Sequence, residues 1–454
     1  MSTNTPPQGS AEERDIDHSL GIQDKLQTGW RSRLRVLEVI FGVLLVLRLL
    51  YPLFSSPQDH LFSDPLRHWN NALAFLHPTI MGSNDPYLYQ LWLFVLQRAT
   101  RWSHAGISLG TGLLCALMPY GWYRALRELV PRRVALVGAV VMALVPDFIG
   151  IYAYFMNETL LLSLTGFAFW LTFRARRKGT VVAFGLAAAV WIAAGFTRSA
   201  AVPLAFLSLL WVWLPASRRV TKAAVSLVLL TIVAIPAGLH GRANLGYFAP
   251  FGNLYLHKIY RTSDGVWMNM AFGPGGWYMF SSPSFSYPTF YPFSHWVSRR
   301  AGAVFINVDL SRGREDWSRE LARVEKSRKM PRLIDTSENF LFLAFGQSWP
   351  NCNLKTVTGW LTVWGRWVWV PLIVFVAYGV VRRKFRGVEY LLPVTGLLVF
   401  LWLGLQQNAI VEGRFRLPME PVFLASAVIL IHRLRAREPL ARHTGPGLAF
   451  DRAG

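Results

Sequence analysis

The chain has 454 residues, 53% of them hydrophobic, and carries a formal net charge of +22. The apolar share exceeds the roughly 45–50% usual for soluble domains, and the apolar residues fall in blocks of roughly 20. These features predict an all-α polytopic membrane protein and argue against a soluble one. The basic residues lie in short clusters between the apolar blocks, so membrane topology explains the charge better than a nucleic-acid partner does.

Ten apolar segments are candidate membrane spans. They run approximately over 36–53, 105–122, 134–155, 159–173, 181–196, 202–214, 223–239, 357–381, 390–405 and 418–431. Several are short for a bilayer, so tilted or partly buried helices are expected. Basic clusters flank these segments at 31–35, 124–133, 174–178, 218–222, 382–386 and 433–437. All six fall on one side of a ten-span bundle, and the positive-inside rule then predicts that both termini are cytoplasmic.

This topology divides the chain into a core and loops. We expect a cytoplasmic tail at 1–30, a transmembrane catalytic core at 31–240, a large outer loop at 241–356, C-terminal transmembrane helices at 357–437 and a second cytoplasmic tail at 438–454. The tail at 1–30 has no apolar region of a cleaved signal peptide. The large loop is rich in aromatic residues, Gly and Pro, with a more polar helical stretch at about 314–329. No internal repeat is visible, which weakens an inverted-repeat transporter.

The first outer loop, at 55–104, contains the strongest candidate for chemistry. Leu66, Trp69, Leu73 and Leu76 have helical spacing, which predicts a helix lying along the membrane surface. Asp64 stands one turn before Arg67 on this helix and could act as a general base toward an acceptor hydroxyl. Its alternative is a helix N-cap, with Pro65 at the first helical position, and the two are compatible.

Three further acids lie on the predicted outer side. Asp85, before Pro86, is a candidate for binding a metal or sugar hydroxyls, and turn formation explains it equally well. Glu158 lies at the turn between the third and fourth spans. It either caps a helix or, as an acid at membrane depth, is functional. Asp147 is a weaker candidate that a polar contact between helices also explains.

Arginines at outer turns require an anionic partner, because they run against the positive-inside trend. Arg198, Arg414 and Arg416 match a phosphate, which a guanidinium binds bidentately. The alternative is pairing with Glu412, Glu420 or Glu158. Arg48, near the outer end of the first span, is expected to extend to the interface.

Cysteine and histidine give no sign of a metal centre. Cys115 falls in a predicted span and Cys352 in an outer loop, so neither a disulfide framework nor a zinc site is expected. The histidines at 60, 68, 77 and 240 lack zinc-site spacing and are interpreted as ordinary interfacial residues. No phosphate-binding Gly loop and no Gly-x-Ser-x-Gly motif occurs, so a cytoplasmic nucleotide site has no support.

Taken in order, these segments resemble the integral-membrane glycosyltransferases of the GT-C fold. The nearest branch is that of the protein O-mannosyltransferases and lipid A aminoarabinose transferases. That branch commonly has Asp-Glu-x-Arg-Tyr in the first outer loop, where this chain has Asp64-Pro-Leu-Arg67-His68. The remaining matches are Asn84-Asp-Pro-Tyr-Leu-Tyr89, Pro146 with Glu158, Thr197-Arg198 and Arg414-Phe-Arg-Leu-Pro418. The resemblance covers spans one to seven and the last span, and it does not extend to 241–356.

The resemblance implies transfer of a sugar from a polyprenyl-phosphate donor to an acceptor hydroxyl on the outer face. The acceptor is a lipid, glycan or protein, and the setting is glycan biosynthesis at the cell envelope. Asp64 and Glu158 are then the expected catalytic residues. The expected substrate-binding residues are Arg67, Asp85, Tyr87, Arg198, Arg414 and Arg416.

Further expectations concern a possible metal ion, the location of the protein and alternative functions. Glu158 or Asp85 could hold a divalent cation, although Pro65 replaces the second acid of the family pattern and leaves the metal question open. The expected location is a bacterial inner (plasma) membrane, with the active site on the periplasmic face. The alternatives are a polymerase or ligase of lipid-linked polysaccharide and a non-enzymatic lipid-glycan transporter.

Overall fold

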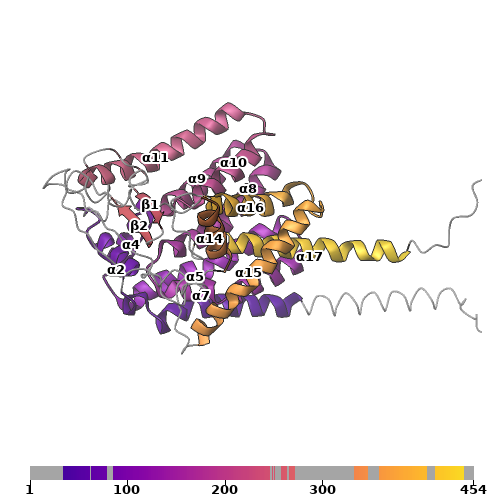
Figure 1. The fold of residues 1–454 in the computed structure, drawn as a ribbon, viewed down its shortest axis with the longest axis horizontal. Coiled ribbons are helices and arrows are strands. Elements are labelled where there is room, and N and C mark those ends of the chain that lie inside the picture. Colours follow the sequence, from indigo (N-terminus) through magenta and orange to yellow (C-terminus); the bar gives the residue numbers. More distant parts are fainter. Residues whose placement is uncertain are drawn as a thin grey trace, which may run out of the picture.

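The computed structural model describes residues 34–61, 63–78, 85–245, 248, 250, 257–262, 265–270, 332–345, 357–405 and 415–443. These residues are mostly helical, which confirms the helical part of the expected class (Figure 1). The strands among them form one antiparallel hairpin, in which β1 (His257–Thr262) pairs with β2 (Gly265–Met270). The hairpin and α14 (Arg332–Phe345) lie within the segment expected to be a large outer loop. The helical stretch expected at about 314–329 lies outside the described residues.

The other helices follow one another along the chain. They are a first helix at 34–54, η1 (Pro57–Asp59), α2 (Ser63–Leu73), α4 (Tyr87–Ala99), α5 (His104–Arg127), α6 (Arg132–Leu144), α7 (Asp147–Gly150), η2 (Ile151–Ala153), α8 (Asn157–Lys178), α9 (Val181–Thr197), α10 (Ala201–Trp213), α11 (Arg219–Leu245), α15 (Val357–Val381), η5 (Gly387–Tyr390), α16 (Leu391–Leu405) and α17 (Glu420–His443).

Every one of the ten expected spans contains helix, but fewer qualify as membrane spans by length and apolar character. Three described segments do so: Leu34–Asp59, Arg219–Ala243 and Gly387–Leu405. A fourth qualifies if the bent pair α6 and α7–η2 is taken as one span. The other expected spans do not meet this test of length and apolar character. Two of them, α9 and α10, have only 17 and 13 residues.

The third expected span is broken rather than continuous. Residues Arg132–Leu144 and Asp147–Ala153 form helices bent by 67° relative to each other. Pro146 explains the break, because the residue before a proline is excluded from the helical region. Val145 accordingly has φ −64° and ψ 121°. The span expected over 134–155 is therefore a bent pair of helices that pass the test for a membrane span only when they are taken together.

Arg48 joins this break to the rest of the bundle. It is only 2% exposed, so the expectation that it extends to the interface is wrong. Its Nε donates to the carbonyl of Cys115 at 2.8 Å, while its two terminal nitrogens donate to Ala143 at 3.0 Å and to Phe148 at 2.5 Å. A proline break deprives nearby carbonyls of helical partners, and a single guanidinium can satisfy several of them.

Close helix packing in the bundle core fixes the position of α8. A Cβ atom on Gly166 of α8 would lie 2.7 Å from the backbone nitrogen of Trp122 in α5, so only glycine fits this crossing. Trp122 itself is fully buried. Further along α8, Trp191 of α9 donates from Nε1 to Thr172 Oγ1 at 2.9 Å. These contacts place the first turn of α8 beside the last turn of α9.

The two ends of the described chain extend to the same side of the molecule. In Figure 1 the first helix and α17 both run to the right, whereas α2 and α4 lie at the opposite end of the bundle. Ion pairs tie the elements on the side of the chain ends. Arg132 pairs with Glu38 at 2.5 Å, and Arg433 donates to Glu389 at 3.0 Å. The α2–α4 end is therefore remote from both described ends.

Candidate functional site

Helix α2 presents its polar residues inward and its apolar stripe outward. Asp64, Arg67, His68 and Asn71 follow i, i+3, i+4 and i+7 spacing and therefore share one face. His68 and Asn71 are buried, and α2 packs against α4. Of the four residues in the predicted apolar stripe, Leu66, Leu73 and Leu76 are exposed, whereas Trp69 packs against the core. This is the arrangement expected of a helix that faces lipid with one side and a polar site with the other.

The start of α2 differs by one residue from the expectation. The helix begins at Ser63, so Asp64 lies within the first turn rather than at the N-cap. A carboxylate in the first turn still interacts favourably with the positive end of the helix dipole. The alternative role of Asp64 as a helix-start residue is thus retained in a modified form.

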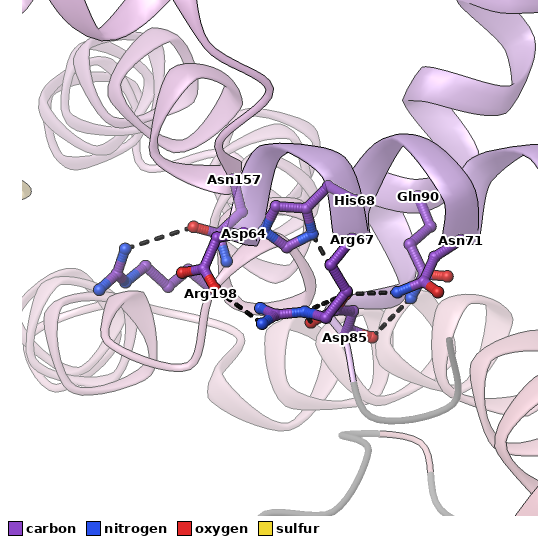
Figure 2. Close-up of polar contacts among 8 residues, drawn as sticks. All are labelled: Asp64, Arg67, His68, Asn71, Asp85, Gln90, Asn157 and Arg198. Carbon is purple, nitrogen blue, oxygen red and sulfur yellow. Dashed lines mark hydrogen bonds and ion pairs between the residues drawn. The ribbon is translucent and has the colours of Figure 1, made fainter. Parts of the chain in front are cut away.

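Arg67 joins the two acids of the first outer loop. Its Nη1 lies 2.7 Å from Asp64 Oδ1, and its Nε lies 3.2 Å and 3.1 Å from the two carboxylate oxygens of Asp85. Figure 2 shows the guanidinium between the two carboxylates. The side chain of Asp64 is 24% exposed, whereas that of Asp85 is 6% exposed. Asp64 is therefore the one of the pair that a substrate can reach.

Asp85 is held by groups from both helices. Asn71 Nδ2 donates to Asp85 Oδ2 at 2.5 Å, and His68 Nδ1 lies 3.2 Å from the same oxygen. Gln90 Nε2 donates to the Asp85 carbonyl at 2.8 Å. Burial alone would raise the pKa of Asp85, but the charges of His68 and Arg67 outweigh it and lower the pKa to about 2. Asp85 is therefore a fixed anion that anchors α2 to the start of α4.

A second acid–arginine pair lies where the first turn of α8 meets the end of α9. Glu158, in the first turn of α8, has no exposed surface and forms an ion pair with Arg198. Arg198 is the C-cap of α9, and its Nη1 donates to Asn157 Oδ1 at 3.3 Å. Its guanidinium also lies 5.3 Å from the ring centre of Phe415. The alternative that Arg198 pairs with Glu158 is thus confirmed.

Aromatic contacts join the two pairs into one region. Trp69 of α2 stacks on Phe155, three residues before Glu158, with ring centres 4.9 Å apart. Tyr89 of α4 hydrogen-bonds to Thr159 and makes an edge contact with His68 at 5.2 Å. Burial raises the pKa of the Tyr89 phenol, so it remains a neutral partner. Figure 2 shows Arg198 and its partner Asn157 in the same close-up as Asp64 and Arg67.

The remaining expected site residues have other surroundings. Tyr87 begins α4 and packs against Phe75 at 5.6 Å and His240 at 5.4 Å, and burial raises its pKa. Asp147 begins α7 and is 3% exposed. Arg414 lies outside the described residues.

The side chain of Arg416 is inaccessible to a substrate, and its contacts indicate a structural role. It is fully buried, and its Nε donates to Glu420 at 2.8 Å. Its Nη1 donates to the carbonyls of Leu343 and Ala344, both at 2.7 Å. These two carbonyls belong to the last turn of α14, where helical partners are missing. Arg416 thus caps α14, and the alternative that it pairs with Glu420 is confirmed.

The acids of the site do not fit a divalent cation as they are arranged here. Among the described residues, no group of three or more His, Cys, Asp or Glu side chains is placed to hold a metal ion. The reason lies at Arg67, because its guanidinium occupies the space between Asp64 and Asp85. A metal bridging both acids would have to displace this positive group.

Three contributors to the site were not identified from the sequence. His68, Asn71 and Gln90 all contact Asp85. The polar spacing of residues 64, 67, 68 and 71 on one helical face was a signal that could have identified the first two. Gln90 gave no such signal, because its role depends on where α4 begins.

Comparison with known proteins gives no relative. No protein-family model matches the chain, and no curated protein matches it. The resemblance to GT-C glycosyltransferases therefore depends on the residues quoted above, and the function must be argued from the geometry of the site.

Proposed function

We propose that this protein is a membrane glycosyltransferase that moves a sugar from a polyprenyl-phosphate donor to an acceptor hydroxyl. The observation that carries the proposal is the partly exposed carboxylate of Asp64, held by Arg67 next to a second buried acid–arginine pair. The site lies at the end of the bundle remote from both described chain ends (Figure 1). A carboxylate in such a position can accept a proton from a hydroxyl while guanidinium groups nearby meet a phosphate.

In the proposed reaction Asp64 is the general base. The acceptor oxygen attacks the anomeric carbon, and its proton passes to the Asp64 carboxylate. The bond between the anomeric carbon and the phosphate oxygen breaks, and its electron pair leaves with the polyprenyl phosphate. Arg67 keeps the Asp64 carboxylate oriented through the contact of 2.7 Å. Orientation of a base in this way contributes to the rate by removing unproductive geometries.

Arg198 is the described arginine best placed to meet the leaving phosphate. Its side chain is 10% exposed and already pairs with Glu158, which has no exposed surface. A phosphate that develops charge in the transition state would compete with Glu158 for this guanidinium. Arg414 shares the proposed role as a sequence-based expectation. Arg416 is left out, since its nitrogens serve Glu420 and the end of α14.

The membrane setting belongs to the same proposal. We infer that the ten expected spans cross a bacterial inner membrane, with the shorter helices inside the bundle, and that both termini are cytoplasmic. The support is the common side of the basic clusters and the three segments that are long and apolar enough to cross a bilayer. The site would then face the periplasm, where the donor's sugar is displayed.

The decisive experiment measures sugar transfer in membranes containing the protein. Membranes are incubated with radiolabelled polyprenyl-phosphate sugars, and Asp64→Asn is compared with the wild type. Loss of a general base should slow transfer by about 10²- to 10⁴-fold. The matched control is Asp59→Asn, because Asp59 is an exposed acid in the same loop, with 65% of its side chain accessible.

The outcomes separate the readings. Transfer by Asp64→Asn near the wild-type rate would show that Asp64 is not the base. Growth of a lipid-linked polysaccharide, without transfer of single sugars, would favour a polymerase or ligase. Movement of donor across the bilayer of proteoliposomes without a new glycosidic bond would favour a transporter.

A further inference from the structure

Arg67 lies where it can do more than orient the base Asp64, because it contacts two acids. A single guanidinium contacts both acids of the first outer loop, at 2.7 Å from Asp64 and at 3.1 Å from Asp85. Divalent cations commonly occupy such a position between two carboxylates. An arginine there supplies positive charge without a cofactor, and it remains protonated at any physiological pH.

A third potential ligand faces the same carboxylate. His68 is 2% exposed, and its Nδ1 lies 3.2 Å from Asp85 Oδ2. The nitrogen makes no well-aligned hydrogen bond within the described part of the chain. This nitrogen lies within ion-pair distance of Asp85, and an imidazole that has lost its proton there can share a metal ion with the carboxylate. Imidazole and carboxylate together suit Mn²⁺ and Zn²⁺.

We propose that Arg67 is a built-in cation that replaces a divalent metal at this site. We further propose that its removal opens a metal site formed by Asp64, Asp85 and His68. The catalytic meaning of this inference rests on the proposed function, whereas the exchange of guanidinium for metal rests on the geometry alone. In the wild type the guanidinium separates Asp64 from Asp85, which explains why the three ligands do not converge.

The electrostatics favour this exchange once Arg67 is absent. Asp85 is buried, and the guanidinium of Arg67 lies 3.1 Å from its carboxylate. Without the guanidinium, two carboxylates would share a small space, and such a pair either takes up a proton or attracts a cation. A metal with two carboxylate ligands and one imidazole ligand would restore the charge balance.

The test measures metal binding rather than catalysis. The purified full chain in lipid nanodiscs is titrated with Mn²⁺, and bound metal is followed by electron paramagnetic resonance. We expect Arg67→Ala to bind one Mn²⁺ per chain at least about tenfold more tightly than the wild type, the scale on which shell residues alter metal affinity. Arg67→Ala/Asp85→Asn and Arg67→Ala/His68→Phe should each lose this site.

Two controls make the result interpretable. Arg67→Lys keeps a positive charge and should not gain the site, while Arg98→Ala removes an exposed arginine on α4 and should behave like the wild type. Size-exclusion profiles of all variants establish that they are folded. A folded Arg67→Ala that binds no more Mn²⁺ than the wild type overturns the proposal. Stoichiometric Mn²⁺ binding by the wild type that Asp85→Asn abolishes would also overturn it.

An activity measurement separates this proposal from the proposed function. Wild-type sugar transfer should be unchanged by EDTA. If it is lost in EDTA and restored by Mn²⁺, the built-in cation is refuted while the glycosyltransferase assignment stands. If no sugar is transferred at all but Arg67→Ala gains the Mn²⁺ site, the glycosyltransferase assignment is refuted while the exchange of guanidinium for metal stands.

Discussion

Each acid at the site is stabilised by charges that a substitution can remove one at a time. Asp85 faces Arg67, His68 and Asn71, whereas Glu158 faces Arg198 and lies fully inside the bundle. A buried charge that loses its partner is costly, whereas loss of both partners together is much less so. A single substitution therefore measures the cost of leaving a buried charge unpaired, whereas a paired substitution measures the net contribution of the pair to folding stability.

The low pKa of Asp85 makes folding stability depend on pH. Because its pKa falls from 3.8 to about 2 on folding, the unfolded chain binds more protons in acid. The stabilisation is complete above about pH 5 and is lost as the pH falls toward 2, and a shift of this size corresponds to about 2 kcal/mol. Thermal unfolding of the wild type and Asp85→Asn in detergent should therefore differ most near pH 7 and converge toward pH 2. A difference that stays constant over this range would contradict the low pKa.

Glu158 and Arg198 should show strong energetic coupling. Glu158→Gln or Arg198→Gln alone leaves an uncompensated partner in the bundle and should cost about 3–5 kcal/mol of folding stability. The double variant should cost clearly less than the sum of the two. Unfolding free energies of the four proteins, measured in one detergent, give the coupling energy. If the two costs are additive, neither residue is the main partner of the other.

At the scale of secondary structure, the break between α6 and α7 is stabilised by Arg48, a residue far from it in the sequence. Arg48 satisfies carbonyls that lie 67, 95 and 100 residues away in sequence. One of these belongs to Cys115, whose side chain is fully buried. Loss of the guanidinium should therefore loosen the packing around a native thiol.

This gives a labelling experiment with a built-in reporter. In a Cys352→Ser background, Arg48→Met should raise the rate of maleimide labelling of Cys115 by about tenfold or more, because three backbone acceptors lose their donor. Arg35→Met, which removes an exposed arginine from the same helix, should leave the rate unchanged. Equal labelling of Arg48→Met and the wild type would show that Arg48 does not hold the packing around Cys115.

The sequence predicted helix in all ten apolar segments and along the stripe from Leu66 to Leu76, most of which lies in α2, because apolar length and helical spacing are local properties. It did not predict the environment of Arg48, whose partners come from three distant segments brought together by the break at Pro146. The same limit applies to Arg416, which serves the end of α14 through contacts over 70 residues away. The partial exposure of Asp64 could not be predicted either, because it depends on where the folded chain places Arg67 and Asp85.

At the scale of the whole molecule, the two described chain ends lie on one side and the site on the other (Figure 1). This arrangement predicts opposite accessibility for two exposed positions, Asp59 and Ala436. In a Cys115→Ser/Cys352→Ser background, Asp59→Cys should react with a membrane-impermeant maleimide in intact cells. Ala436→Cys should react only after the cells are permeabilised. Equal reaction of both positions in intact cells would refute the proposed orientation.

The outward apolar stripe of α2 has a consequence for how a lipid donor would be recognised. Leu66 and Leu73 of α2 and Leu76 in the turn after it are exposed, while Asp64 on α2 remains accessible. A helix anchored in this way holds its carboxylate at the depth of the lipid headgroups. A donor would then present its sugar phosphate while its isoprenoid tail stayed dissolved in the bilayer. We expect transfer to depend strongly on the sugar and only weakly on the number of isoprene units.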